Sequence, residues 1–190
     1  IRMKHITLRL LPFALAAMAG AVSSSCNDDG TTTWEQYKEW RQTNLDFYEE
    51  QKFLMDPDGD GMYYQTQVAP WNSGAEILIR YLNDRSKTEG NLSPMLTSTV
   101  DVKYIGRFYN GVAFDSSYSV QPDSVFTTGV SDVIAGWTLA LQYMRVGDSA
   151  RVVIPYGMGY GSSGSGSIYP YSTLVFDIKL KDIVDYEEKH

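Results

Sequence analysis

The second half of the chain alternates apolar and polar side chains with a period of two residues. Val100, Val102 and Tyr104 alternate with polar neighbours, and the segments 150–154 and 174–180 repeat the pattern. Such alternation is typical of half-buried antiparallel strands. We predict strands over six ranges: 62–68, 76–82, 99–104, 112–115, 150–154 and 174–180.

Apolar residues spaced three and four positions apart predict a short helix that starts within Asp132-Val-Ile-Ala-Gly-Trp137. Ile134, Trp137, Leu141 and Met144 have this spacing and form one apolar face. The Gly at position 136 lacks a Cβ, which would let backbone or a ligand come close. Strands around one short helix indicate an α+β domain, which we place at 61–185.

A second helix is predicted over 31–53. Thr32 and Thr33 are followed three positions later by Glu35 and Gln36, as in capping boxes. This segment also carries several aromatic and apolar residues: Trp34, Tyr37, Trp40, Leu45, Phe47 and Tyr48. Because so aromatic a helix seldom stays solvated, we expect it to pack on the domain; packing on a second copy of the chain is the alternative.

The first 25 residues have the pattern of an export signal. Basic residues precede an apolar run over 10–22, which is shorter than the ~20 residues that a membrane-spanning helix needs, and small residues end it. The single cysteine, Cys26, follows directly, as in bacterial lipoprotein signals, where this cysteine carries lipid. An ordinary cleaved signal is the alternative. We expect a signal at 1–25, a tether and helix at 26–60 and a C-terminal tail at 186–190.

Charge and composition exclude some functions. The formal charge of −7 argues against a nucleic-acid partner, because an acidic body repels phosphates. The two histidines, His5 and His190, stand near the ends of the sequence, so no Ser/His/Asp catalytic set is evident. Asp56-Pro-Asp-Gly-Asp-Gly61 resembles the start of a calcium loop, but its twelfth position is Gln67, where a Glu is needed. We favour a turn there and leave calcium open.

Aromatic residues at strand spacing could enclose an apolar pocket with Trp137 as its floor. The candidates for its walls are Tyr104, Phe114, Phe126, Tyr160 and Phe176. The alternative is that these side chains only fill the core, and the two interpretations overlap because pocket walls are also core.

Several segments resemble, in order and spacing, the FKBP-type peptidyl-prolyl cis-trans isomerases. They are Val102-Lys-Tyr-Ile-Gly106, Gly111-Val-Ala-Phe-Asp-Ser-Ser117, Val133-Ile-Ala-Gly-Trp137, Met144-Arg-Val-Gly147, Ile154-Pro155 with Tyr160-Gly161, and Thr173-Leu-Val-Phe-Asp177. The resemblance covers about half of the chain. It implies a curved antiparallel sheet wrapped around the short helix.

The resemblance also implies roles for individual residues. Trp137 would be the pocket floor, and the Ile134 N–H would donate to a carbonyl of the bound segment. Asp115 and the Tyr160 hydroxyl would form the polar pair at the rim. The implied walls are Tyr104, Phe114, Phe126, Val133 and Phe176, with Ile168 on an overhanging loop.

One position and two stretches depart from the family pattern. Ser124 stands where many members carry an aromatic residue, which predicts a more open wall. The stretch 118–124 lacks the basic residue that some relatives pair with their Asp. The loop 162–167 is shorter and richer in Gly and Ser than in many members, a composition typical of a flexible loop.

The activity implied by the resemblance is cis-trans isomerisation of Xaa-Pro bonds during folding of exported proteins. Proline-containing polypeptides would be substrates, macrolide immunosuppressants would be ligands, and no metal or cofactor is required. The lipid anchor would hold the protein in a bacterial cell envelope, at the outer membrane. One alternative is a binding or chaperone lipoprotein without turnover, which Ser124 and the Gly/Ser loop support, and another is a structural lipoprotein. The client proteins and the oligomeric state stay open.

Overall fold

A computed structural model describes residues 32–120 and 123–186. The predicted signal, Cys26 and the last four residues lie outside this part of the chain. The helices are α1 (Thr33–Gln36), α2 (Lys38–Lys52), α3 (Ser117–Val120) and α4 (Ala135–Tyr143), with 3-10 turns η1 (Arg85–Thr88) and η2 (Tyr156–Met158). The strands are β1 (Gln65–Ala69), β2 (Asn72–Tyr81), β3 (Thr99–Phe108), β4 (Ala113–Ser116), β5 (Phe126–Gly129), β6 (Ser149–Ile154) and β7 (Leu174–Asp185).

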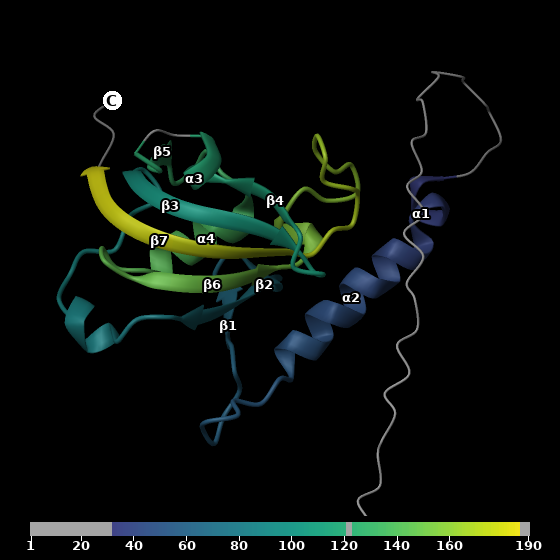
Figure 1. The fold of residues 1–190 in the computed structure, drawn as a ribbon, viewed down its shortest axis with the longest axis horizontal. Helices are drawn as coiled ribbons and strands as arrows, with labels where there is room; N and C mark the ends of the chain where they lie inside the picture. The colour runs from purple at the N-terminus through teal and green to yellow at the C-terminus, as the bar shows by residue number, and fades with distance from the viewer. Residues whose placement is uncertain (1–31, 121–122, 187–190) are drawn as a thin grey trace, which may run out of the picture. The chain divides into compact units, whose positions relative to one another are not determined.

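The strands form one antiparallel sheet in the order β1-β2-β6-β7-β3-β4, and β5 pairs with β3. The long pair β3–β7 runs through its middle, from Thr99 opposite Asp185 to Phe108 opposite Leu174. This pair curves around α4 (Figure 1). The predicted α+β class, with a curved antiparallel sheet around a short helix and an N-terminal helix, is confirmed.

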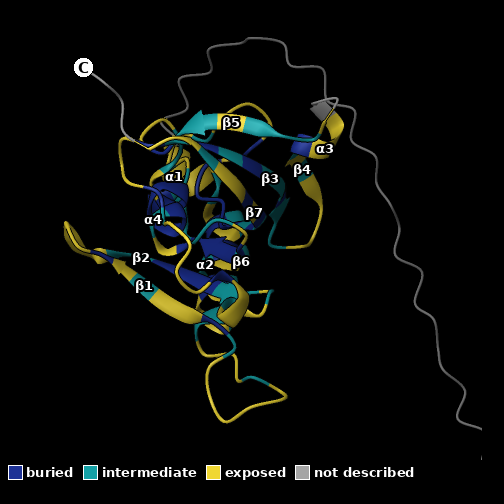
Figure 2. Ribbon diagram, turned by 90° about the vertical axis from the view of Figure 1, so that its left-hand side faces the viewer, coloured by how far each residue is buried: buried dark blue, intermediate teal, exposed yellow. Residues whose placement is uncertain are grey.

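Helix α4 and the concave face of the sheet share the main core. Its members include residues of α4 and its C-cap, β2, β6 and β7: Trp137, Leu141, Met144, Ile77, Ile79, Val152, Ile154 and Ile178. In Figure 2, α4 and much of the central strands are dark blue. A Cβ on Gly136 would lie 2.5 Å from the Ile154 Cγ2, so this glycine lets α4 rest directly on β6. The helix is buried from Gly136 to Leu141, more completely than the predicted single apolar face, because strands surround it.

Helix α2 covers the other face of the same sheet. Tyr48 of α2 packs in a second apolar cluster with Tyr64, Leu78 and Val153. Successive strand residues point to opposite faces, so Leu78 meets α2 while its neighbours Ile77 and Ile79 belong to the main core. The expected packing of the N-terminal helix on the domain is confirmed. The continuous helix predicted over 31–53 is broken at Tyr37, the residue between α1 and α2.

Several boundaries differ from the predictions. The segment 62–68 becomes strand only from Gln65, and β5 and α3 had no clear period in the sequence. Asp56–Gly61 forms a turn, in which the Asp56 N–H donates to the Gly61 carbonyl at 2.8 Å. Within the described ranges, no group of three or more His, Cys, Asp or Glu side chains is placed to hold a metal ion. No helix described in the structure combines the length and apolar character needed to cross a bilayer.

Candidate functional site

A cavity of about 470 Å³ opens between the start of α4, the strands β3, β4, β5 and β7, and the loop that precedes β7. This volume lies in the range of small-ligand sites, roughly 300–1,000 Å³. Its lining includes every residue predicted for the site: Tyr104, Phe114, Asp115, Phe126, Val133, Ile134, Trp137, Tyr160, Ile168 and Phe176. It also includes four residues that the sequence did not indicate: Asp132, Ser165, Gly166 and Ser167.

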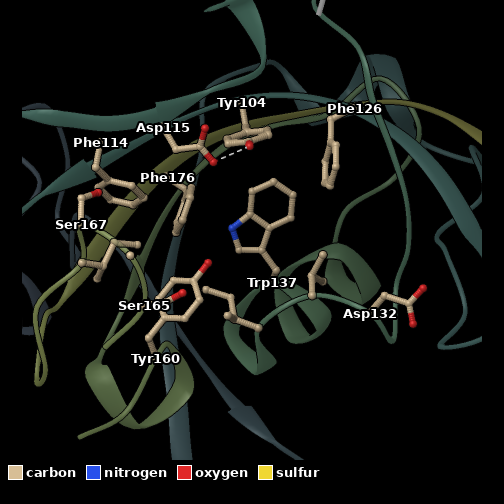
Figure 3. A pocket seen from close by; sticks show the side chains of 14 residues that line it. Tyr104, Phe114, Asp115, Phe126, Asp132, Trp137, Tyr160, Ser165, Ser167 and Phe176 are labelled. Carbon is tan, nitrogen blue, oxygen red and sulfur yellow. Dashed lines mark hydrogen bonds between the residues drawn. The ribbon is translucent and has the colours of Figure 1, made fainter. Parts of the chain in front are cut away.

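Trp137 forms the floor between two aromatic side chains that stand perpendicular to it (Figure 3). The Tyr104 ring centroid lies 5.0 Å from that of Trp137, and the Phe176 centroid lies 5.2 Å from it. Edge-to-face pairs at this spacing are attractive beyond the area that they bury. Trp137 is only 4% exposed and belongs to the main core, so the floor is also a structural residue.

Gly106 lets two wall residues meet. A Cβ at this position of β3 would lie 2.7 Å from both the Phe114 Cζ and the Phe176 Cε1. With the Cβ absent, the two rings contact each other edge to face with centroids 5.6 Å apart. Glycine is therefore needed at position 106, because any side chain there would collide with these two rings of the pocket wall.

The rim carries a hydrogen bond that the sequence did not predict. The Tyr104 hydroxyl donates to the Asp115 Oδ2 at 2.6 Å (Figure 3), and Asp115 and Tyr160 both line the cavity. Burial, and then the hydrogen bond and charge of Asp115, raise the pKa of the Tyr104 hydroxyl. Burial and the Asp115 charge also raise the pKa of Tyr160. Both hydroxyls are protonated at neutral pH, as an ordinary tyrosine already is, and can donate.

Ile134 stands at the N-cap of α4, where a free backbone donor is expected. Its carbonyl accepts from the Trp137 N–H at 2.8 Å. Its own N–H has no acceptor among the described residues, and the residue lines the cavity. This N–H is thus available to a bound carbonyl, which is compatible with its predicted role.

The Gly/Ser loop is a folded structure rather than the flexible connection that its composition suggests. Ser165 and Ile168 exchange two backbone hydrogen bonds, at 2.9 and 2.8 Å. A Cβ on Gly164 would lie 2.3 Å from the Ile168 carbonyl oxygen, and its φ is 69°, so glycine is needed there. In the sequence, the spacing of the glycines in this loop was the one feature that could have predicted a specific turn at the pocket.

Ser124 is the position where the sequence predicts a more open wall. It is not among the residues that line the cavity and stands just before β5 in a left-handed conformation, with φ of 64°. The neighbouring Phe126 lines the cavity, with its ring 5.7 Å from that of Tyr104. The more open wall at position 124 stays a prediction.

Comparison with known proteins agrees with this geometry. Residues 90–181 match the sequence profile described as FKBP-type peptidyl-prolyl cis-trans isomerase. A macrophage infectivity potentiator from Trypanosoma cruzi is 42% identical over 53% of this chain and 50% of its own length. An FKBP-type 22 kDa peptidyl-prolyl cis-trans isomerase from Escherichia coli is 36% identical over 56% of this chain and 59% of its own length. The chain thus spans less than two thirds of these curated relatives.

A solved structure covers more of the chain. A peptidyl-prolyl cis-trans isomerase from Pseudomonas syringae superposes with a TM-score of 0.60 over 77% of this chain and 95% of its own. The sequence identity is 29%.

Proposed function

We propose, from the match of residues 90–181 to the FKBP-type peptidyl-prolyl cis-trans isomerase family, that the chain catalyses cis-trans isomerisation of Xaa-Pro bonds. The main support is that one cavity gathers all ten residues predicted for the site. The substrates would be proline-containing segments of exported proteins that are still folding.

The chemistry requires only rotation about an amide bond. Resonance in the planar amide sets a barrier of ~18–20 kcal/mol, and uncatalysed X–Pro exchange takes tens to hundreds of seconds. A protein lowers this barrier when it binds the twisted amide better than either planar form. Twisting reduces the partial charge on the carbonyl oxygen, so a cavity walled by aromatic rings favours the twisted form over the planar one.

The residues would divide this task as follows. The proline ring would lie on Trp137 between Tyr104 and Phe176, and the Ile134 N–H would hold a carbonyl of the bound chain. The Tyr160 hydroxyl, which is protonated at neutral pH, would donate to a second carbonyl. The Asp115–Tyr104 hydrogen bond would fix the rim. None of these steps involves a nucleophile or a metal.

The first prediction tests catalysis with Tyr160→Phe. Removing one hydroxyl should lower kcat/KM about 2- to 10-fold, the equivalent of one hydrogen bond, with little change in the midpoint of urea unfolding. Trp137→Ala should instead lower both activity and stability, by ~3–5 kcal/mol for the latter. The measurement is the isomerisation rate of an Xaa-Pro peptide, followed by exchange NMR.

Tyr186→Phe is the matched control, because this tyrosine is exposed at the end of β7, away from the cavity. A parent protein that binds a proline peptide without accelerating its exchange would support the non-catalytic alternative. A parent that neither binds nor accelerates would exclude both. Binding of a macrolide such as FK506 to the same cavity is a further expectation, which competition with the peptide would test.

We also propose that the protein is a lipoprotein of a bacterial cell envelope, attached at the outer membrane through Cys26. The support is the sequence alone: a basic start, an apolar run over 10–22 and the single cysteine directly after the small residues. Several acyl chains make membrane attachment stable, whereas one chain is marginal.

The second prediction follows from this attachment. Cys26→Ala in the full chain should move the protein from the membrane fraction to the soluble fraction, and mass spectrometry of the parent should show acyl chains on an N-terminal Cys26. An unmodified mature N-terminus at another residue would contradict the proposal. Ser25→Ala, which keeps a small residue before the cysteine, should leave the fractionation unchanged.

A further inference from the structure

The C-terminal end of the loop over the pocket is hydrogen-bonded to helix α2. We call residues 160–173 the overhanging loop; it carries Tyr160 and the lining residues 165–168. Asn44 of α2 is fully buried, and its Oδ1 accepts from the Thr173 N–H at 2.7 Å. The Thr173 hydroxyl donates to the Asn44 carbonyl at 2.9 Å. Two hydrogen bonds therefore fix the end of the loop to the middle of the helix.

Aromatic contacts extend this attachment along the loop. The Trp40 indole lies edge to face on Tyr169, with ring centroids 5.4 Å apart. Its Nε1 donates to the Ser172 hydroxyl at 3.2 Å, and that hydroxyl donates to the Tyr169 carbonyl at 2.7 Å. Tyr169 directly follows Ile168, which lines the cavity. The helix thus contacts the residue next to the pocket wall.

Tyr171 has an uncommon backbone conformation and packs against the N-terminal helices. Its φ is 62°, a region that a non-glycine residue occupies only when its surroundings fix it. The surroundings come from the N-terminal helices: Trp34 packs edge to face on Tyr171 at 5.6 Å, and the Arg41 guanidinium lies 5.6 Å from its ring. The Tyr171 N–H closes the base of the loop on the Gly161 carbonyl at 2.9 Å.

We infer that α1 and α2 position the overhanging loop over the pocket, so that Asn44 and Trp40 are positioning residues for the site although neither lines the cavity. In Figure 1 the yellow-green loop lies beside α1 and the first turns of α2. The base of the loop is closed at Gly161–Tyr171 and its tip at Ser165–Ile168. A shift of residues 169–173 is therefore passed to Ile168 at the wall. The consequence for turnover rests on the proposed isomerase function.

The test is Asn44→Ala in the full chain, read by amide hydrogen exchange and by steady-state kinetics. Loss of the acceptor for Thr173 should speed exchange of the Ser165 and Ile168 amides about tenfold or more. The Ile168 wall contacts a substrate in its planar and twisted forms alike, so KM should rise about 3- to 10-fold while kcat stays within about 2-fold. Trp40→Phe keeps an aromatic ring and removes the donor to Ser172, so it should give the same changes on a smaller scale.

Two controls separate positioning from general stability. Val100→Ala removes buried surface from the main core at the end of the β3–β7 pair opposite the loop, and Gln42→Ala changes an exposed residue of α2. Neither should alter loop exchange or KM. The inference is wrong if Val100→Ala, at an equal loss of stability, gives the same changes as Asn44→Ala, or if Asn44→Ala and Trp40→Phe change neither quantity.

The exchange measurement needs no turnover. A parent protein without isomerase activity would therefore refute the proposed function, and loop exchange would still decide whether α2 positions the loop. If Asn44→Ala does not fold, Trp40→Phe decides the question by the same two measurements.

Discussion

Asp148 is a buried polar residue that links the segment 83–88 to the turn before β6. Its carboxylate, in the turn before β6, is fully buried. It accepts from the Thr88 hydroxyl at 2.6 Å, the Arg145 N–H at 2.9 Å and the Asn83 amide at 3.1 Å, and Arg85 lies 3.2 Å away. Burial alone would raise the pKa of Asp148, but these hydrogen bonds and the Arg85 charge outweigh it and lower the pKa.

The sign of this shift gives a pH prediction. A carboxyl whose folded pKa lies below its unfolded value of ~3.9 contributes stability that is fully present above that value and is lost as the pH falls through the folded pKa. Asp148→Asn should therefore lower the free energy of unfolding at pH 7 by ~1–3 kcal/mol. The deficit should shrink as the pH falls below about 4. Urea unfolding between pH 7 and pH 3 measures this.

Asp58→Asn is the control for that series, because Asp58 is exposed in the Asp56–Gly61 turn. Its substitution should change the free energy of unfolding at pH 7 by no more than about 0.5 kcal/mol. A deficit of Asp148→Asn that stays constant across the whole range would contradict the assignment.

At the scale of elements, α2 packs on the outer face of the sheet and forms a second apolar cluster with it. Leu78 and Val153 are fully buried beneath it, although the strands that carry them also face the main core on their other side. The residues that α2 buries most are Arg41, Asn44 and Tyr48, and two of these are polar. Arg41 is satisfied by the Trp34 carbonyl at 2.6 Å and by stacking on the Trp34 ring at 3.1 Å.

Docking of α2 can be tested from the sheet. Leu78→Ala should cost ~2–5 kcal/mol, the range for truncating a buried leucine, because α2 covers this side chain. If the helix left the sheet in solution, Leu78 would be exposed and the cost would fall below about 1 kcal/mol. Val68→Ala, at an exposed position of the neighbouring strand β1, is the control and should stay within about 0.5 kcal/mol of the parent. Urea unfolding monitored by tryptophan fluorescence provides both values.

At the scale of the whole molecule, the two faces of the sheet have different roles: one carries the cavity, and the other packs against α2. The concave face holds α4 and the cavity, and the outer face holds α2, which reaches around to the overhanging loop through Trp40 and Asn44. The helix that stabilises the outer face therefore also contacts the loop that closes the pocket. Substitutions on α2 should for this reason be examined for effects on both stability and substrate binding.

The sequence alone determined the fold class, the main strands, the central helix and ten of the fourteen residues that line the cavity. This was possible because the period-two alternation of Val100 to Tyr104 and the helical spacing around Trp137 are local consequences of backbone geometry. The order and spacing of the family segments added the identity of the walls. The break at Tyr37 in the predicted N-terminal helix, and β5 with α3, had weaker local signals and were missed.

Only the tertiary structure decided which polar groups meet. The Tyr104 hydroxyl donates to Asp115, and Asn44 pairs with Thr173 at a separation of 129 positions. No local pattern encodes such partners, because a buried polar side chain is stable only where a distant segment supplies its hydrogen bonds. The Gly/Ser composition of the overhanging loop is compatible with many conformations, and its contacts with α2 select one of them.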